Sequence, residues 1–191
     1  AALPLEKKIN LGLDLQGGAH VLAGMDVDEL KRDWLDKIRD QINAALRKDN
    51  VPRASVANAQ SGVLVRLAKP EDMDAAYKAL RTLPQPIAGA AITGSTALDL
   101  DVTKQGNDAV LVKPTEPGIV ARISSAISSA SEIVRNRCDP GGNKEMVVQR
   151  QGSDRILLQA PGIENIKEIE PCFDVAKLTF HLLHASMNVE E

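Results

Sequence analysis

Aromatic side chains are scarce in this sequence. Its 191 residues include only two Phe, one Tyr and one Trp. A hydrophobic core must therefore be built from Ile, Leu, Val and Ala, and few rings remain for stacking on nucleic-acid bases. Positive charge is not in excess either, because 23 Lys and Arg residues face 26 Asp and Glu residues, for a formal net charge of −3. Together these absences argue against a nucleic-acid binder.

Long hydrophobic runs are also missing. The apolar stretches fall far short of the roughly 18 residues that a membrane helix needs, and no signal-peptide pattern opens the chain. We therefore expect a soluble domain or the soluble piece of a larger protein. Two cysteines, Cys138 and Cys172, are too few for a disulfide scaffold and lack metal-ligand spacing. They fit either one bridge or two buried thiols, and we favour thiols because an isolated Cys commonly behaves as a small core residue.

No constellation of catalytic or metal-binding residues is recognisable. The three histidines, His20, His181 and His184, do not have the spacing of a metal site. A Gly-x-Ser-x-Gly elbow is missing, and Cys172 has no neighbouring base in the sequence. The sequence thus predicts no catalytic residue, no metal site, no cofactor and no enzymatic activity.

The first half of the chain alternates strand-like and helix-like patterns. Residues 9–27 read as a strand interrupted by Gly17 and Gly18, with Asp28 as the N-cap of the next helix. Helical spacing runs to residue 48, two short strands follow at 54–59 and 63–67, and Pro70 opens a second helix. We expect residues 91–102 to be extended and residues 103–107 to form a loop.

The second half repeats this order. We expect a strand at 109–112, a helix at 119–137, a hairpin at 146–151 and 155–160, a short helix carrying Ile163, Ile166 and Ile169, and a last strand at 176–183. The repeat predicts an α+β fold of two tandem ferredoxin-like (βαββαβ) units, with helices packed on one face of antiparallel sheets. The predicted domains are residues 1–104, the N-terminal strand plus the first α+β unit, and residues 105–191, the second unit.

Two polar motifs stand out from this frame. The first lies inside the opening strand and comprises Gly12, Asp14, Gln16, Gly17 and Gly18. Glycine permits positive φ and close backbone approach, so this motif is either a structural bend or a device that ties a neighbouring loop. The second motif surrounds the end of the long helix and the hairpin tip and comprises Arg135, Asn136, Arg137, Gln149, Arg150, Gln151 and Gly152. Helix capping and hairpin register would explain it without any further role.

Several segments together resemble the protein-export family SecD. Residues 9–20 read INLGLDLQGGAH, which resembles the signature that follows the first transmembrane helix of SecD. A second SecD motif is similar to IVRNR at 133–137 followed by VVQRQG at 147–152, and DRILLQAPGI at 154–163 and AKLTF at 176–180 continue it in the right order. Residues 28–110 are less specific.

The resemblance implies the periplasmic base module of a SecD-like inner-membrane subunit, without most of the family's mobile head. Such a subunit acts with SecF beside the SecYEG channel and uses the proton-motive force to assist translocation of the emerging preprotein. This chain would be anchored through membrane helices that it lacks. The Gly-Gly motif would then couple the module to the membrane, and the second motif would contact the other unit or the head. The helix ends carrying Cys138 and Cys172 should lie at opposite ends of such a unit, which argues against a bridge.

One rival interpretation comes from a different class of protein. Tandem ferredoxin-like units also occur as stand-alone sensors that bind small ligands at the edges between domains. Flanking hydrophobic helices in the gene would favour the SecD interpretation, and their absence would favour the sensor. An RNA-binding tandem is a third alternative, disfavoured by the acidic charge and the lack of aromatic residues.

Overall fold

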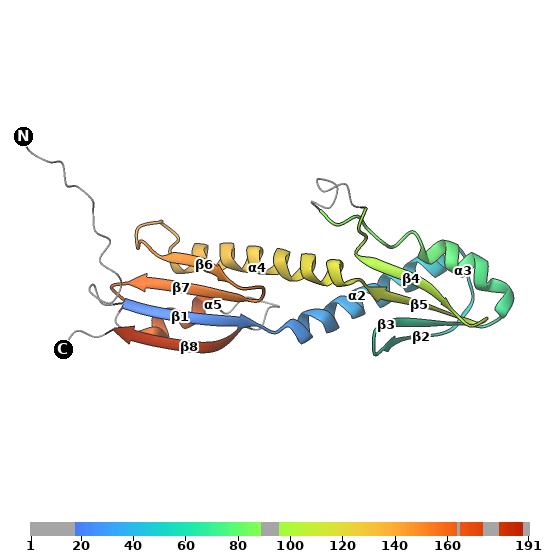
Figure 1. Cartoon of the computed structure of the whole chain (residues 1–191), viewed down its shortest axis with the longest axis horizontal. Helices are drawn as coiled ribbons and strands as arrows, with labels where there is room; N and C mark the ends of the chain where they lie inside the picture. Colours follow the sequence, from blue (N-terminus) through green and yellow to red (C-terminus); the bar gives the residue numbers. More distant parts are fainter. Residues whose placement is uncertain (1–17, 89–95, 164, 174–179, 189–191) are drawn as a thin grey trace, which may run out of the picture. The chain divides into compact units, whose positions relative to one another are not determined.

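The computed structural model describes residues 18–88, 96–163, 165–173 and 180–188 of the chain. The chain divides into two compact units (Figure 1), of which unit 1 combines residues 1–26 with 126–191 and unit 2 comprises residues 27–125. This division differs from the predicted boundary between residues 104 and 105. The first strand pairs with strands of the C-terminal part of the chain, so unit 1 is interrupted by unit 2.

Unit 1 contains an antiparallel sheet of four strands. The strands are β1 (Gly18–Met25), β6 (Val147–Gln151), β7 (Arg155–Pro161) and β8 (Phe180–Asn188), arranged in the order β6-β7-β1-β8. Helix α4 (Glu116–Cys138) connects unit 2 to β6, and the 3₁₀ turn η3 (Ile166–Glu168) and α5 (Glu170–Phe173) lie between β7 and β8. Strands β1 and β6, which are connected through α4, are separated in the sheet by β7. Strands β7 and β8, which are connected through α5, are separated by β1.

Small aliphatic side chains fill the interior of unit 1. Residues 19–23 of β1 and the residues of β7 alternate between buried and less buried positions, as expected for strands with one covered face. The part of the long helix in unit 1 contributes four buried residues at helical spacing. The buried hydrophobic residues that these three elements give to unit 1 are Ala19, Val21, Ala23, Met25, Ile156, Leu158, Ala160, Ile127, Ala130, Val134 and Cys138. No aromatic residue belongs to this set, in keeping with the composition.

Unit 2 has a second antiparallel sheet, covered by two helices. Its strands are β2 (Arg53–Ala59), β3 (Gly62–Leu67), β4 (Leu100–Gln105) and β5 (Ala109–Pro114), in the order β2-β3-β5-β4. Helix α2 (Val27–Lys48) contacts β2 and β3, while α3 (Met73–Leu80), which follows the 3₁₀ turn η1 (Pro70–Asp72), contacts β4 and β5. The two helices also contact each other, so they cover the same face of the sheet.

The core of unit 2 follows from the helical spacing in the sequence. Trp34, Ile38, Ile42 and Leu46 recur every fourth residue, which places them on one stripe of α2. All four are buried against the sheet residues Val63, Val65, Val110 and Val112 and the α3 residues Met73, Ala76, Ala79 and Leu80. The α+β class with two antiparallel sheets is thus confirmed.

Several predicted element bounds are wrong. Helix α2 begins at Val27, so Asp28 lies in its first turn rather than at its N-cap. Residues 103–105 are predicted as a loop because their side chains are polar, but they belong to β4. Their backbone groups pair with β5, and this pairing does not require apolar side chains. The last strand, β8, runs to Asn188, past the predicted end at residue 183, and the predicted positions 176–179 lie outside the described residues. The predicted short helix is described as two pieces, η3 and α5.

A disulfide joins Cys138 to Cys172, so the prediction of two buried thiols is wrong. The Cα atoms of the two residues are 5.4 Å apart, within the range usual for a disulfide. The argument for opposite helix ends assumed a second helix long enough to run antiparallel to the first. The disulfide shows instead that Cys172, in α5, lies beside the C-terminal end of α4.

Candidate functional site

The Gly-Gly motif lies at the entrance to β1. Gly12, Asp14, Gln16 and Gly17 fall outside the described residues, and Gly18 is the first residue of the strand. Its φ of 149° lies in a region that side-chain-bearing residues rarely adopt. Gly18 pairs with Pro161 of β7 on one side and with Asn188 of β8 on the other. The motif therefore ends where the central strand of the unit 1 sheet begins.

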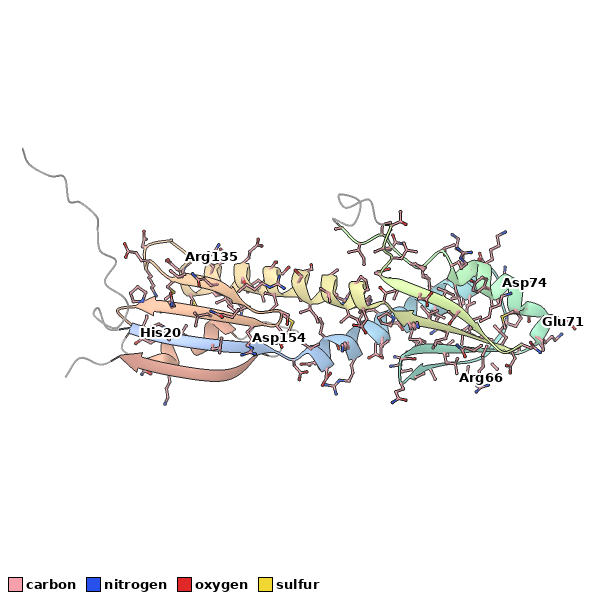
Figure 2. The ribbon with its side chains drawn as sticks, in the orientation of Figure 1. His20, Arg66, Glu71, Asp74, Arg135 and Asp154 are labelled. Carbon is pink, nitrogen blue, oxygen red and sulfur yellow. A yellow bond between two sulfur atoms is a disulfide. The ribbon has the colours of Figure 1, made fainter. Side chains whose placement is uncertain are left out.

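The second predicted motif is brought together only in part. Arg135 lies near the C-terminal end of α4, and its Nη2 donates a hydrogen bond to the Val148 carbonyl oxygen at 3.5 Å (Figure 2). Arg135 thus ties the long helix to β6 within unit 1. Asn136 and Arg137 follow it on exposed positions of the helix.

The rest of this motif forms the β6–β7 hairpin. Gly152 has a φ of 63°, which the turn between the strands requires. Arg150 donates from Nε to the Gly152 carbonyl oxygen at 3.1 Å and from Nη2 to the Ser153 carbonyl oxygen at 3.4 Å. Gln149 and Gln151 are exposed on the same edge strand. These local bonds match the structural interpretation of the motif, and a contact with unit 2 or a head stays a prediction.

A guanidinium over the Trp ring is a feature that the sequence did not indicate. The Arg122 side chain lies 4.9 Å from the centre of the Trp34 ring, within the range of a cation–π contact. Burial lowers the pKa of Arg122, and the nearby Asp99 carboxylate partly opposes that shift.

Two surface cavities lie within single units. In unit 2, a cavity of about 750 Å³ has a mixed lining, with apolar residues such as Leu35, Leu100 and Ile119 beside the charged residues Lys31, Asp101, Lys113 and Glu116. In unit 1, a cavity of about 730 Å³ is open and lined mainly by polar residues around Asn143, Lys144 and Gly162. Neither cavity coincides with the predicted motifs.

The described part of the chain contains no group of three or more His, Cys, Asp or Glu residues that could hold a metal ion. Of the helices that the structure describes, none is long and apolar enough to span a bilayer.

Two family models match separate parts of the sequence. The model described as "Protein translocase subunit SecDF, P1 domain, N-terminal" matches residues 127–185, which lie in unit 1. The model described as "SecD/SecF GG Motif" matches residues 5–28, which include the Gly-Gly motif and β1. Both matches therefore fall mainly on the two segments that assemble unit 1.

Proteins named "Protein translocase subunit SecD" are similar to the chain along nearly its whole length. The protein from Rickettsia felis is 29% identical over 184 residues, which cover 96% of this chain and 33% of the relative. The protein from Rhodobacter capsulatus is 32% identical over 177 residues, covering 91% and 31% respectively. The protein from Calditerrivibrio nitroreducens is 30% identical over 190 residues, covering 98% and 35%. The chain thus spans about a third of the length of these relatives, and the resemblance noted in the sequence is confirmed.

Proposed function

We propose, on the premise that this chain is a SecD homologue, that it is the periplasmic base module of a SecD-like subunit and assists the translocation of proteins across the bacterial inner membrane. The observation that carries this proposal is the joint match of the P1 model to residues 127–185 and of the GG-motif model to residues 5–28. The whole subunit would work with SecF and the SecYEG channel and draw on the proton-motive force. The module itself would have no catalytic activity and would need no cofactor.

The pairing of the terminal strands of unit 1 supports an anchored module. Gly18, at the start of β1, is the register partner of Asn188, at the end of β8. The chain therefore enters and leaves this sheet at the same point. Forces that act on the segments before Gly18 and after Asn188 would be applied to adjacent, hydrogen-bonded strands of one sheet.

The disulfide supports placement on the periplasmic side. Disulfides persist in oxidising compartments such as the bacterial periplasm and are rare in the reducing cytosol. Cys138 and Cys172 are 3% and 7% exposed, so the bond is shielded from thiols in solution.

We further propose that both units derive from the ferredoxin-like pattern. Unit 1 has the order strand, helix, strand, strand, helix, strand, with each helix-connected strand pair split by another strand. The strand orders of the two sheets, β6-β7-β1-β8 and β2-β3-β5-β4, correspond position by position, and β5 stands where β1 stands in unit 1. In unit 2 the strand at this position is therefore the last one in the sequence, whereas in unit 1 it is the first. Unit 2 would then be a version in which the first strand has moved to the end.

The two motifs would have separate roles in such a module. Asp14, Gln16, Gly17 and Gly18, together with Gly12, would fix the backbone at the entry to β1 and couple it to the membrane segment. Arg135, Arg137, Gln149 and Arg150 would secure unit 1 to unit 2 or to the head of the full-length protein.

Site-specific photo-crosslinking in the full-length membrane protein tests this function. A photoreactive residue would replace Ser125, Ser129 or Gln151, which are exposed, while export of a secretory protein is arrested. We expect crosslinks to the translocating protein or to SecF and the channel subunits. A probe at Ile127, which is buried, is the matched control for nonspecific labelling. Crosslinks to none of these proteins from any exposed position would contradict the proposed function.

A further inference from the structure

One edge of the unit 2 sheet is open for strand pairing. In the order β2-β3-β5-β4, β2 and β4 are the edge strands (Figure 1). Among the strands that the structure describes, β2 pairs with β3 alone. Its other side carries backbone N–H and C=O groups that can accept a further strand.

The register identifies which backbone groups face outward. The two-residue turn Gln60–Ser61 makes Ala59 and Gly62 the hydrogen-bonded pair that closes the hairpin. Hydrogen-bonded and non-hydrogen-bonded pairs alternate in an antiparallel ladder, so Val56 and Asn58 belong to non-hydrogen-bonded pairs. The N–H and C=O groups of these two residues therefore point away from β3.

The side chains of β2 do not protect this edge. Residues 54–59 are ASVANA, without charge, proline or a large side chain. Soluble proteins usually guard edge strands with Lys, Pro or bulges, and a bulge interrupts β2 only at its start, between Arg53 and Ser55.

The opposite edge of the same sheet is protected. On β4, the Lys104 ammonium pairs with the Asp74 carboxylate at 2.7 Å, and Asp101 pairs with Lys113 at 3.8 Å. These charges would have to lose water when another strand approaches. The contrast between the two edges singles out β2.

We propose that β2 receives an extended segment of an unfolded polypeptide as a fifth strand of the unit 2 sheet. This inference rests on the proposed function, in which the module meets a chain that has not yet folded. An added strand is recognised through its backbone, which every polypeptide has, whereas side-chain pockets give specificity. The small neutral side chains of residues 54–59 suit partners of varied sequence.

The size of the edge favours an unfolded chain over a second copy of this protein. Only residues 55–59 lie between the bulge and the turn, and at about 3.4 Å per residue they offer a contact roughly 17 Å long. A stable complex buries about 1,200–2,000 Å² of surface, and a single added strand of this length is too short to supply an interface of that area. It fits a weak, transient contact with a chain in passage.

Asn58 allows the edge to be blocked without breaking the hairpin. Asn58→Pro removes the outward N–H and adds a ring at the edge, and proline is tolerated where the N–H faces solvent. The Asn58 side chain also donates a hydrogen bond from Nδ2 to the Asp36 carboxylate at 3.1 Å. Asn58→Ala is the matched control, because it loses that bond and keeps the backbone N–H.

The experiment measures binding of the 191-residue chain to reduced, carboxymethylated α-lactalbumin, which stays unfolded in buffer, with native α-lactalbumin as the folded control. We expect binding to the unfolded probe only, together with slower hydrogen–deuterium exchange in residues 53–59. Asn58→Pro should weaken binding about tenfold relative to Asn58→Ala, as expected for losing a backbone hydrogen bond and gaining a clash. Circular dichroism of both variants verifies that the fold is kept.

The proposal would be overturned by no binding, by equal affinities of the two variants, or by binding without protection of residues 53–59. Protection that grows with the concentration of the chain alone would assign the edge to a second copy and overturn it too. Failure here is separable from failure of the proposed function, because the crosslinks from Ser125, Ser129 and Gln151 do not depend on β2.

Discussion

The disulfide between Cys138 and Cys172 should contribute a large share of the stability of unit 1. The bond closes a loop between residues separated by 34 positions. In the chain-entropy treatment, a loop of this length corresponds to a loss of unfolded-state entropy worth about 4 kcal/mol at 25 °C. Native domains are stable by only about 5–15 kcal/mol, so its loss should lower the free energy of unfolding of unit 1 markedly.

Urea denaturation can follow the two units separately. Trp34, the single Trp of the chain, is 6% exposed in the core of unit 2. Its fluorescence therefore reports unit 2, whereas far-ultraviolet circular dichroism reports both units. We expect the double variant Cys138→Ala with Cys172→Ala to lose about 2 M in the urea midpoint of the unit 1 transition, for a urea slope near 2 kcal/mol per molar. The fluorescence midpoint should move much less.

Reduction of the unmodified protein is the necessary control. The alanine variant also removes two buried sulfur atoms, whereas reduction keeps both side chains and breaks only the bond. The two perturbations should lower the same transition by similar amounts. Equal midpoints for the oxidised and the reduced protein would refute the reasoning.

Three smaller perturbations test other parts of the structure. Gly118→Ala should destabilise unit 2 although alanine favours helices, because the added Cβ would clash with the Asp99 carbonyl oxygen. The Trp34 fluorescence midpoint measures this loss. Ile38→Ala, at a fully buried site, should lower the free energy of unfolding of unit 2 by about 2–5 kcal/mol in the same assay. Lys104→Met should raise the pKa of Asp74, which the Lys104 hydrogen bond and charge hold below its ordinary value, in an NMR titration of the carboxyl group. Because the pKa of Asp74 is lowered in the folded state, its pairing with Lys104 stabilises the fold at neutral pH, and this stabilisation disappears as the pH falls through the lowered pKa. An unchanged Asp74 pKa in the Lys104→Met variant would contradict the assignment of the shift to Lys104.

The sequence predicts local elements well where periodicity is strong. The four-residue spacing from Trp34 to Leu46 places α2 and its buried face correctly, because one helix face determines both. The hairpin of β6 and β7 is also predicted, since its turn contains Gly152 between two strand-like runs. Helix α2 and the β6–β7 hairpin are both determined by residues that are close to one another in the sequence.

Features that depend on distant residues were not predictable in the same way. The similarity of the two halves suggested contiguous units, but β1 finds its partners beyond unit 2, and no local pattern records that pairing. The disulfide was missed for a related reason, because it joins residues 34 positions apart whose spatial proximity no local pattern records. The contact of Arg122 with Trp34 requires α4 and α2 to be neighbours, which the sequence does not state.

The interruption of unit 1 by unit 2 has a consequence for the order of folding. All strands of unit 2 lie within residues 27–125, so its sheet can close as soon as that stretch has been synthesised. Strand β1 is made earlier, yet its partners lie at residues 155–161 and 180–188. Bringing them together closes a long loop, and a folded unit 2 shortens the flexible part of it. We therefore expect the inserted unit to fold first and the strand at the N-terminus to be among the last to find its place.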